Sequence, residues 1–556
     1  MSIANSSTTY DFIIVGAGVS GLFNAWRLLN SNPDLNILII EKLGRTGGRL
    51  QTTTVGIEYP ADGQIYQVKD EEGGMRFNSD MYNLCRLIDV LKLTPVPFYM
   101  SYKNANTNRC YFRGNPFTIA ETPGIWNAIY NLSRAEADKS PGDIILGVLQ
   151  KILQQNPGQK FSGSDNIPLG PDEWQTFRNV CTYNGYVINQ WGFWALMRTA
   201  GLTEECIDWL KNVIGFMGPT QACINAGESL QILLDFPGNE VFNTLREGFQ
   251  SIPSALESIV RTQATVNLNE TVTHIAENES GTLQITSNRN SYACRKLILA
   301  VPAEGLRKII ATSGLLQNAA GSFQYAVDSV KDMELTKVGL YFNERWWHSN
   351  PAINLTCGPS FNDLPLGTVY CFQQYPGEDG QDENYNGPAA LTIYNDYDRG
   401  SFWKEMQNIG TPYLGVVAQP ENTIAASTCL VDEALRQIKM LFNLQESDTI
   451  PMPVLTTYRV WGEGEFGYGY HQYKLNVNDT DEVYPCIYNP LPNVFICNES
   501  WSPEQGWIEG ALIASELVLT QGLGLPPFIE KSNLPTKTPD YAGSNNKRPL
   551  GPANIF

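Results

Sequence analysis

Two short runs of consecutive apolar residues stand near the start of the chain, Phe12–Val15 and Ile37–Ile40. Four apolar residues without interruption are typical of a strand buried on both faces of a parallel sheet. Between the runs, apolar residues recur at helical spacing, at Leu22, Ala25, Trp26 and Leu29. The pattern therefore predicts a strand–helix–strand unit whose helix ends at the Asn32–Asp34 break.

The rest of the chain shows three kinds of pattern. From about Thr118 to Asp235, Gly, Pro and Asn breaks separate helical periodicity and predict helices over 143–155, 171–181 and 203–214. Around 248–300 a helix is followed by strands that end at Leu297–Pro302, and the buried run Val494–Cys497 precedes a helix starting near Gly506. From about 331 to 485 many short β-like runs alternate with turns. We expect a mixed α/β fold with a helical insertion.

Length and charge narrow the class of protein. With 556 residues, 42% of them hydrophobic, the chain should form two or three domains, since a single core rarely exceeds about 250–300 residues. A net charge of −19 argues against nucleic acid as a partner and gives no support to an anionic membrane. No apolar run approaches the ~18 residues of a membrane span. Residues 1–10 lack the features of a secretory signal, so a cytoplasmic location is expected unless a leader has been removed.

The cysteines and histidines form no disulfide or metal pattern. The eleven cysteines are odd in number and contain no Cys-x-x-Cys pair, which favours reduced, mostly buried thiols. The three histidines, His274, His348 and His471, lie far apart, so no zinc site is expected. The chain also lacks a Gly-x-Ser-x-Gly elbow and a phosphate-binding Gly-Lys-Ser/Thr loop.

A glycine-rich turn, Gly16-Ala17-Gly18-Val19-Ser20-Gly21, joins the first strand to its helix. The first glycine permits a tight turn, the second lets a pyrophosphate approach the backbone, and the third lets helix and strand pack closely. The helix start around Val19 and Ser20 directs free N–H groups at the phosphates. Glu41, followed by Lys42, ends the second strand about 20 residues later, where a carboxylate accepts ribose hydroxyls and repels a 2′-phosphate. A dinucleotide site is predicted and NADP is disfavoured, while FAD and NAD both remain open.

A second glycine segment, Gly44-Arg45-Thr46-Gly47-Gly48-Arg49, follows the second strand. Its adjacent glycines let backbone approach a bulky ligand, and its arginines can contact phosphate or flavin oxygens. This segment resembles the Gly-Gly-Arg motif of the flavin amine oxidase family, which also carries the N-terminal glycine turn. The resemblance implies FAD as the cofactor, with Gly48 and Arg49 among its contacts.

Within that family the chain looks most like the L-amino-acid oxidases. Glu72–Phe77 resembles their Gly-x-Met-Arg segment, which implies that Gly73, Gly74 and Met75 contact the cofactor. The arginine of that segment, Arg76 here, would touch the cofactor site and pair with the substrate carboxylate, for which a guanidinium fork is well suited; pairing with a structural carboxylate is the alternative.

Two β-like segments resemble further parts of the family's substrate site. Ala390–Tyr394 resembles the strand whose tyrosine, Tyr394 here, provides a second carboxylate contact; a core tyrosine is the alternative. Leu335–Val338 resembles the strand with the lysine, Lys337 here, that holds a water near the flavin and is linked to reoxidation by oxygen. An ordinary surface lysine is the alternative, although burying an ammonium among apolar neighbours is costly without a partner.

The C-terminal part carries the closing flavin motif of the family. Phe495–Glu499 followed by Gly506–Gly510 resembles it, with Glu499 near the ribityl–phosphate region of FAD. Gly506, Trp507 and Ile508 would line the flavin, and Gly506 and Trp507 also the substrate amine. The family usually has Ala-Gly before the glutamate, where this chain has Cys497-Asn498, and asparagine adopts left-handed backbone angles less freely than glycine.

Three more positions resemble the family less closely. Val272 matches a residue whose backbone contacts the adenine, and Trp461 resembles an aromatic residue beside the flavin. His471 falls where the family lines the pocket for the substrate side chain; a hydrogen-bonded loop histidine is the alternative.

The resemblance implies a Rossmann-like FAD-binding domain formed by residues 10–62, 240–328 and 485–525, and a β-sheet substrate-binding domain of residues 63–117 and 329–484. Residues 118–239 would form the helical domain and 526–556 a C-terminal tail. The implied activity is oxidation of L-amino acids by molecular oxygen to 2-oxo acids, ammonia and hydrogen peroxide, by a homodimer. The alternatives are an oxidase of amines or polyamines and a flavin-binding protein without catalysis.

Overall fold

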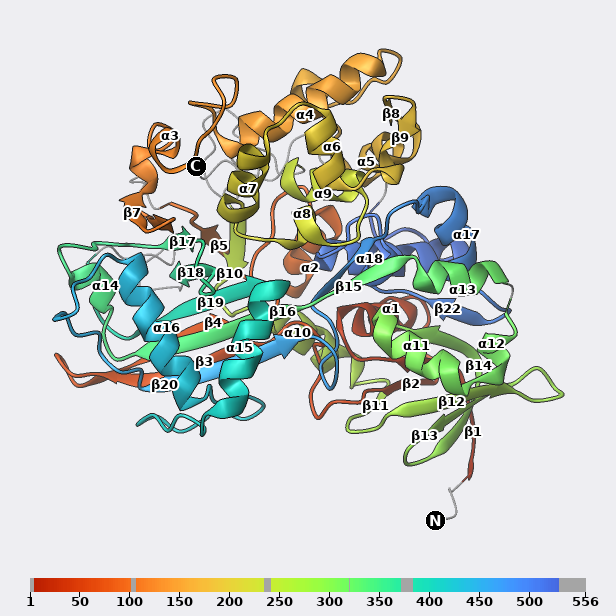
Figure 1. The fold of residues 1–556 in the computed structure, drawn as a ribbon. Helices are drawn as coiled ribbons and strands as arrows, with labels where there is room; N and C mark the ends of the chain where they lie inside the picture. The colour runs from red at the N-terminus through yellow and green to blue at the C-terminus, as the bar shows by residue number, and fades with distance from the viewer. Residues whose placement is uncertain (1–4, 102–106, 235–241, 320, 372–383, 530–556) are drawn as a thin grey trace.

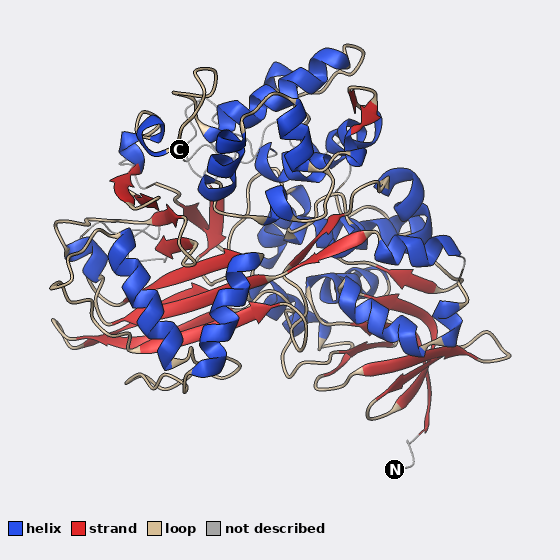
Figure 2. Cartoon of the chain, in the orientation of Figure 1, coloured by secondary structure: helices blue, strands red, loops and turns tan. Residues whose placement is uncertain are grey.

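The computed structural model describes residues 5–101, 107–234, 242–319, 321–371 and 384–529. Two sheets with helices on their faces lie side by side, and a group of helices covers one end of both (Figure 1). Figure 2 shows that the upper group is almost wholly helical, whereas the two lower parts each combine a sheet with helices.

The first sheet contains the predicted strand–helix–strand unit. Among the described residues it has seven strands in the order β11-β2-β1-β14-β13-β12, with β22 pairing β14. The strands β1, β2, β11, β14 and β22 run parallel to their neighbours in this group, while β12 and β13 are antiparallel. Their bounds are β1 Asn5–Val15, β2 Ile37–Ile40, β11 Thr265–Asn267, β12 Val272–Glu277, β13 Leu283–Ser287, β14 Ser291–Leu299 and β22 Val494–Ile496.

Helices cover both faces of this sheet, which explains why its central strands are apolar on both sides. Ile14 and Ile39 face α1 Val19–Ser31, α2 Tyr82–Leu91, α10 Ser251–Val260 and α18 Ile508–Leu517. Ile13 and Leu38 face α11 Ala303–Thr312, α12 Gly314–Gln317, α13 Gly321–Asp328 and α17 Tyr484–Ile487. The mixed α/β class and the Rossmann-like architecture are confirmed.

The second sheet is built mainly from residues 330–473. Its seven described strands run in the order β20-β16-β19-β18-β17-β6-β7. Their bounds are β6 Arg109–Phe112, β7 Asn115–Thr118, β16 Leu335–Phe342, β17 Gly358–Asn362, β18 Thr368–Cys371, β19 Ala389–Asp396 and β20 Leu455–Trp461. One face packs on α14 Trp346–Ser349, α15 Asp398–Ile409 and α16 Thr428–Leu441, and the other on the hairpin of β3 Thr52–Tyr59 and β4 Gln64–Glu71.

The helices α15 and α16 correct the expectation of β-like runs throughout 331–485. Apolar residues recur at helical spacing along α16, at Leu430, Val431, Ala434, Ile438 and Leu441, and all are buried against the sheet. Ser427 caps the N-terminus by accepting a hydrogen bond from the backbone N–H of Leu430. The helical signal was therefore present in the sequence.

The helical segment agrees with its predicted helices. The three helices expected there are α4 Pro141–Gln155, α5 Gly170–Val180 and α7 Glu204–Val213. Their neighbours are α3 Trp126–Ile129, α6 Phe193–Thr199, α8 Gly218–Gln221, α9 Ala226–Leu234 and the hairpin β8 Thr182–Tyr183 with β9 Tyr186–Val187. The fully buried Trp126, Trp174 and Trp209 belong to a core that these helices share.

Two short antiparallel strand pairs join segments that are far apart in the sequence. β5 Pro95–Phe98 pairs with β10 Phe242–Leu245, and β15 Val330–Met333 pairs with β21 Tyr470–Tyr473. The expected boundary at residues 62 and 63 falls inside the turn between β3 and β4, so it divides a hairpin. Of the expected tail, Phe528 packs against Phe23 and Trp26 of α1, while residues 530–556 lie outside the described part.

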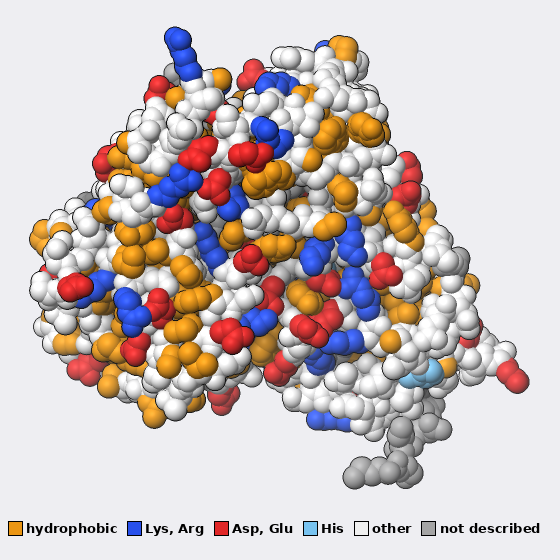
Figure 3. All heavy atoms as spheres, viewed as in Figure 1, with side chains coloured by type: hydrophobic (Ala, Val, Ile, Leu, Met, Phe, Trp, Pro, Cys, Tyr) orange, Lys and Arg blue, Asp and Glu red, His pale blue; other side chains and the backbone are white. Residues whose placement is uncertain are grey.

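All eleven cysteines lie within the described residues. None of the eleven cysteines forms a disulfide, and eight of them are buried, as expected. Within the described ranges, no helix is long and apolar enough to cross a membrane. Acidic and basic side chains are interspersed on the face in Figure 3, without a broad basic patch there.

Candidate active site

A cavity of about 420 Å³ is lined by residues from both sheets and from the helical segment. Ligand pockets commonly measure about 300–1,000 Å³. All the site residues expected from the sequence line this cavity except Gly21 and His471. Positions from Gly16 to Ile508 thus meet around one space, although more than 490 residues separate its ends along the chain.

The turn between β1 and α1 forms one wall. Gly16 has φ of +102°, and a Cβ there would lie 2.5 Å from the carbonyl oxygen of Ala300. Gly21 lies behind the cavity, where a Cβ would come within 1.9 Å of the Gly16 carbonyl oxygen, so it serves close packing of helix and strand. Gly18, Val19 and Ser20 line the cavity at the start of α1, and no side chain caps that helix end. The exposed N–H groups and the helix dipole suit a phosphate.

Glu41 directly follows β2, and two backbone N–H groups fix its carboxylate. Its Oε2 accepts a hydrogen bond of 2.7 Å from the Ala17 N–H, and its Oε1 one of 2.8 Å from the Leu43 N–H. Burial raises the pKa of this carboxyl, against the lowering effect of the two N–H groups. A carboxylate accepts about four hydrogen bonds, so sites remain for ribose hydroxyls. Lys42 and Val272 line the cavity as well.

The second glycine segment lies directly against the first. Gly47 bridges Gly18, and a Cβ on Gly48 would lie 3.4 Å from the Gly18 Cα. Gly47 and Gly48 have φ of +100° and +55°, in the region that favours glycine. Arg45, which the sequence suggested as a ligand contact, instead donates hydrogen bonds to the carbonyls of Thr46, Gly48 and Leu50 and holds this turn together. Arg49 lines the cavity.

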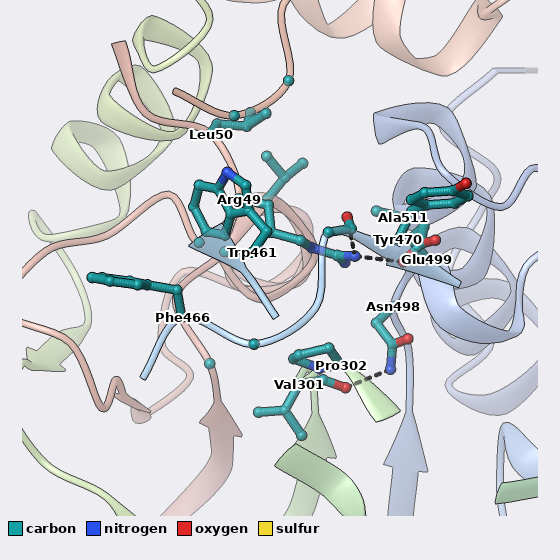
Figure 4. Close-up of a pocket in the computed structure, with 18 of the residues that line it drawn as sticks. Arg49, Leu50, Val301, Pro302, Trp461, Phe466, Tyr470, Asn498, Glu499 and Ala511 are labelled. Atoms are coloured by element: carbon teal, nitrogen blue, oxygen red, sulfur yellow. Dashed lines mark hydrogen bonds and ion pairs between the residues drawn. The ribbon is translucent and has the colours of Figure 1, made fainter. Parts of the chain in front are cut away.

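Arg49 and Glu499 form an ion pair in the cavity wall. Figure 4 shows the guanidinium pointing at the carboxylate, with Arg49 Nη1 2.6 Å from Glu499 Oε2. The other oxygen, Oε1, accepts hydrogen bonds from the backbone N–H groups of His471 and Gly506. Burial alone would raise the pKa of Glu499, but Arg49 and His471 lower it to about 2. Glu499 is therefore a fixed anion at neutral pH.

Asn498 occupies the position where the family usually has glycine, and its backbone conformation does not require glycine. Its φ is −173°, so the backbone is extended and no left-handed conformation is needed. Its Nδ2 donates to the Val301 carbonyl at 2.7 Å (Figure 4), and its Oδ1 accepts from the Ser500 N–H. The side chain thus joins the loop before Glu499 to the end of β14.

Arg76 lies among aromatic rings. Its guanidinium carbon is 4.6 Å from the ring centre of Phe242 and 5.5 Å from that of Phe98, and Nη1 lies 3.4 Å from the Tyr370 hydroxyl. Among the described residues, no carboxylate lies within ion-pair distance of Arg76, although its side chain is buried and lines the cavity. A buried guanidinium without an acidic partner favours an anionic ligand.

Lys337 and Tyr394 face each other across β16 and β19. The ammonium of Lys337 lies 4.7 Å from the centre of the Tyr394 ring and donates to the carbonyls of Glu71 (2.9 Å) and Gly73 (2.7 Å). Burial lowers the pKa of Lys337 to about 8, against the raising effect of Asp70 and Glu71. Burial also raises the pKa of Asp70 to about 6. The lysine is buried at the cavity, unlike an ordinary surface lysine.

Aromatic residues close the cavity near Arg76 and Lys337. Trp507, the residue before α18, lies parallel to Phe242 with ring centres 6.4 Å apart, and Gly506 precedes it with φ of +87°. Trp461 Nε1 donates to the Glu72 carbonyl at 2.6 Å, which fixes the indole in the wall. Gly74, Met75 and Ile508 also line the cavity.

His471 differs from its expected place. The side chain is fully buried, lies behind Glu499 and does not line the cavity. Its Nδ1 is 2.9 Å from Glu499 Oε2, and its Nε2 is 3.3 Å from Asp332 Oδ1. It cannot touch a substrate side chain in this position. The pairing of β15 with β21, which sets this orientation, is a long-range contact that the local sequence does not show.

Several lining or supporting residues were not expected from the sequence. Phe216, Pro219 and Ile232 line the cavity from the helical segment, which carried no recognised motif. Tyr370, which the sequence analysis did not single out, accepts a hydrogen bond of 3.4 Å from Arg76 Nη1. The run Asp70-Glu71-Glu72 could have been noticed, because three consecutive acidic residues before a glycine pair require cations if they are buried.

The fold and the cavity define a dinucleotide-binding protein, and comparison with known proteins is more specific. The family model for flavin containing amine oxidoreductase matches residues 19–518. The chain belongs to this family, and its cofactor is FAD. The glycine cradle, the uncapped start of α1 and Glu41 fit the phosphates and ribose of that cofactor.

The relatives share low sequence identity with this chain, but the matches cover almost its whole length. Achacin of Lissachatina fulica is 24% identical over 92% of this chain and 93% of its own. Aplysianin-A of Aplysia kurodai is 23% identical over 92% of this chain and 90% of its own. Putrescine oxidase bound to putrescine shares the fold with a TM-score of 0.61, at 16% identity over 93% of this chain and 100% of the other.

Proposed function

We propose that the protein catalyses oxidative deamination of L-amino acids, with molecular oxygen as the electron acceptor. The observation that supports this most is Arg76, a buried guanidinium on the FAD cavity with no acidic partner among the described residues. An α-carboxylate would neutralise it and accept two parallel N–H donors.

The charges near Arg76 disfavour a diamine. Arg76 and Lys337 both line this end of the cavity, and the apolar cluster of Met75, Phe98, Phe242 and Tyr370 lies against Arg76. Asp70 and Glu71 lie near Lys337 and raise its pKa, whereas the lining carboxylates Glu41, Glu270, Glu304, Glu465 and Glu499 form no ion pair with Arg76 within the described ranges. An ammonium group of a diamine would meet repulsion at Arg76, whereas an amino acid brings an anion to it.

The chain's residues would bind and orient the substrate. Arg76 and a neighbouring tyrosine hydroxyl, from Tyr394 or Tyr370, would hold the carboxylate, and this fixes the direction of the Cα–H bond. Bound FAD would accept the hydride from Cα and pass two electrons to oxygen, giving hydrogen peroxide. Water would hydrolyse the released imino acid to a 2-oxo acid and ammonia. Lys337 would hold a water at the cavity, and no side-chain base is required.

The test is product analysis with a matched panel of substrates. We expect equimolar peroxide, ammonia and 2-oxo acid from L-amino acids, and none from their D-enantiomers or from the corresponding amines. Peroxide from putrescine or phenylethylamine without any from L-amino acids would establish an amine oxidase instead. Bound FAD with no peroxide from any member of the panel would indicate a flavin-binding protein without this catalysis.

A further inference from the structure

His471 lies in the middle of a row of alternating charges that runs from the FAD cavity toward the surface. Each member is close to the next: Arg49 to Glu499 at 2.6 Å, Glu499 to His471 at 2.9 Å, His471 to Asp332 at 3.3 Å, and Asp332 to Arg307 at 2.6 Å. The side chain of His471 is fully buried, whereas those of Asp332 and Arg307 are 20% and 27% exposed. No part of the catalytic proposal uses this histidine.

The two carboxylates beside His471 favour its imidazolium form. A neutral imidazole has one N–H and one lone pair. With the N–H on Nδ1, the lone pair on Nε2 would face the Asp332 carboxylate. With the N–H on Nε2, Nδ1 could accept from the Ser500 hydroxyl at 3.0 Å, but Glu499 Oε2 would lose its donor at 2.9 Å. The imidazolium form alone presents an N–H toward both carboxylates. His471 Nε2 and Asp332 Oδ1 form an ion pair without the alignment of a hydrogen bond. Asp332 therefore acts on His471 through its negative charge.

The groups around His471 come from four elements. Asp332 faces it from β15, Glu499 and the hydroxyl of Ser500 from the turn after β22, Arg49 from the second glycine segment, and Arg307 from α11 through Asp332. Burial lowers the pKa of His471, but the charge of Glu499, the contact with Asp332 and the hydrogen bond to Glu499 outweigh burial and raise it overall; Arg49 opposes them.

We propose that His471 is a positioning residue that acts, as an imidazolium, by holding Glu499 in place as a carboxylate. Glu499 joins two walls of the FAD cavity: Oε2 binds Arg49, and Oε1 binds the N–H of Gly506, next to Trp507. His471 supplies two of the hydrogen bonds to that carboxylate, one from Nδ1 and one from its backbone N–H. Loss of the imidazolium therefore loosens both walls and weakens FAD retention. This inference depends on the cofactor and not on the choice of substrate.

The experiment measures the rate at which diluted holoenzyme releases FAD, by the rise in flavin fluorescence, from pH 6 to pH 9. His471→Asn keeps an N–H near the Nδ1 position but cannot carry charge. His274→Asn is the matched control, because His274 lies on β12 and bonds the Thr312 carbonyl away from the cavity. At pH 6 to 7 we expect release about tenfold faster in His471→Asn, the effect of losing a charged hydrogen bond, and unchanged release in His274→Asn.

The pH profile separates a charge from simple packing. The ratio of release rates between His471→Asn and the wild type should fall toward one as pH rises through the pKa of His471, because the wild type then loses its imidazolium. A ratio near one at pH 7, or a raised ratio that is constant with pH, would overturn the proposal.

A second measurement tests the proposal if His471→Asn fails to fold. With three histidines in the chain, ¹³C-labelled imidazole signals can be assigned by single substitutions. The His471 signal should report imidazolium at pH 7, and Asp332→Asn should move its titration to lower pH. A neutral His471 at pH 7, or a titration that Asp332→Asn does not move, would contradict the assignment.

Discussion

Replacing Arg76 by alanine is the most informative single change at the substrate end of the cavity. The guanidinium lies 4.6 Å from the Phe242 ring centre and is held by the Tyr370 hydroxyl, so its position is already set before substrate binds. A preorganised charged donor to a carboxylate contributes about 2–4 kcal/mol when it is shielded from water. Loss of this contact should lower kcat/KM for L-amino acids by about 30- to 1,000-fold.

The effect should fall mainly on KM, since Arg76 binds a group that does not change charge during the reaction. Arg76→Lys keeps the charge but loses the planar fork, and we expect an intermediate loss. Peroxide formation is followed with increasing L-amino acid, and FAD content is measured in each variant so that cofactor loss is not mistaken for substrate loss. If Arg76→Ala turns over L-amino acids with the wild-type kcat/KM, the carboxylate is bound elsewhere and the substrate assignment is wrong.

Three further predictions concern the lysine, the glycine turn and a buried ion pair. Lys337→Met should slow flavin reoxidation by oxygen about 100-fold without slowing anaerobic reduction. In the wild type, stopped-flow reoxidation should slow as pH rises through about 8, where the Lys337 ammonium loses its proton. Equal reoxidation rates in the variant and the wild type would rule out this role. Gly21→Ala should abolish FAD binding because its Cβ would lie 1.9 Å from the Gly16 carbonyl oxygen. Gly147→Ala on α4 is the control, because a Cβ there meets open space, and it should keep full flavin absorbance. Purified Gly21→Ala that retains bound flavin would refute the packing argument. Asp479→Asn removes the 2.6 Å partner of the buried Arg178, which keeps Glu228 at 3.1 Å, and should cost about 1.5–3 kcal/mol and lower the Tm. Arg178 lowers the pKa of Asp479 despite burial, so this stabilisation is present above the unfolded pKa of about 3.9 and is lost as pH falls through the lower folded value; a Tm difference that does not narrow in acid would argue against the ion pair.

The cofactor end of the cavity could be predicted from the sequence because its signals are local. The apolar runs Phe12–Val15 and Ile37–Ile40 lie in β1 and β2, and the turn between β1 and α1 has the predicted glycine geometry. Strand, turn and helix are adjacent in sequence there, so spacing alone specifies their arrangement.

The substrate end depends on contacts between distant segments. Phe98, Phe242 and Tyr370 surround Arg76 from three different strands, and no spacing along the chain brings them together. His471 was misplaced for the same reason, because the register of β15 against β21 decides that it faces Glu499. Helix α16 is a different case: its apolar spacing was readable, but the turn-rich residues before it favoured an interpretation as short strands.

The most direct test of the proposed reaction is anaerobic reduction of the bound flavin. Purified holoenzyme is mixed without oxygen with L-amino acids, their D-enantiomers, phenylethylamine or putrescine, and the flavin absorbance is followed. We predict that L-amino acids bleach the flavin, that the D-enantiomers and amines leave it oxidised, and that Arg76→Ala bleaches only at much higher L-amino acid concentration. Bleaching by putrescine or phenylethylamine, with the flavin remaining oxidised in every L-amino acid, would contradict the assignment of an L-amino-acid oxidase.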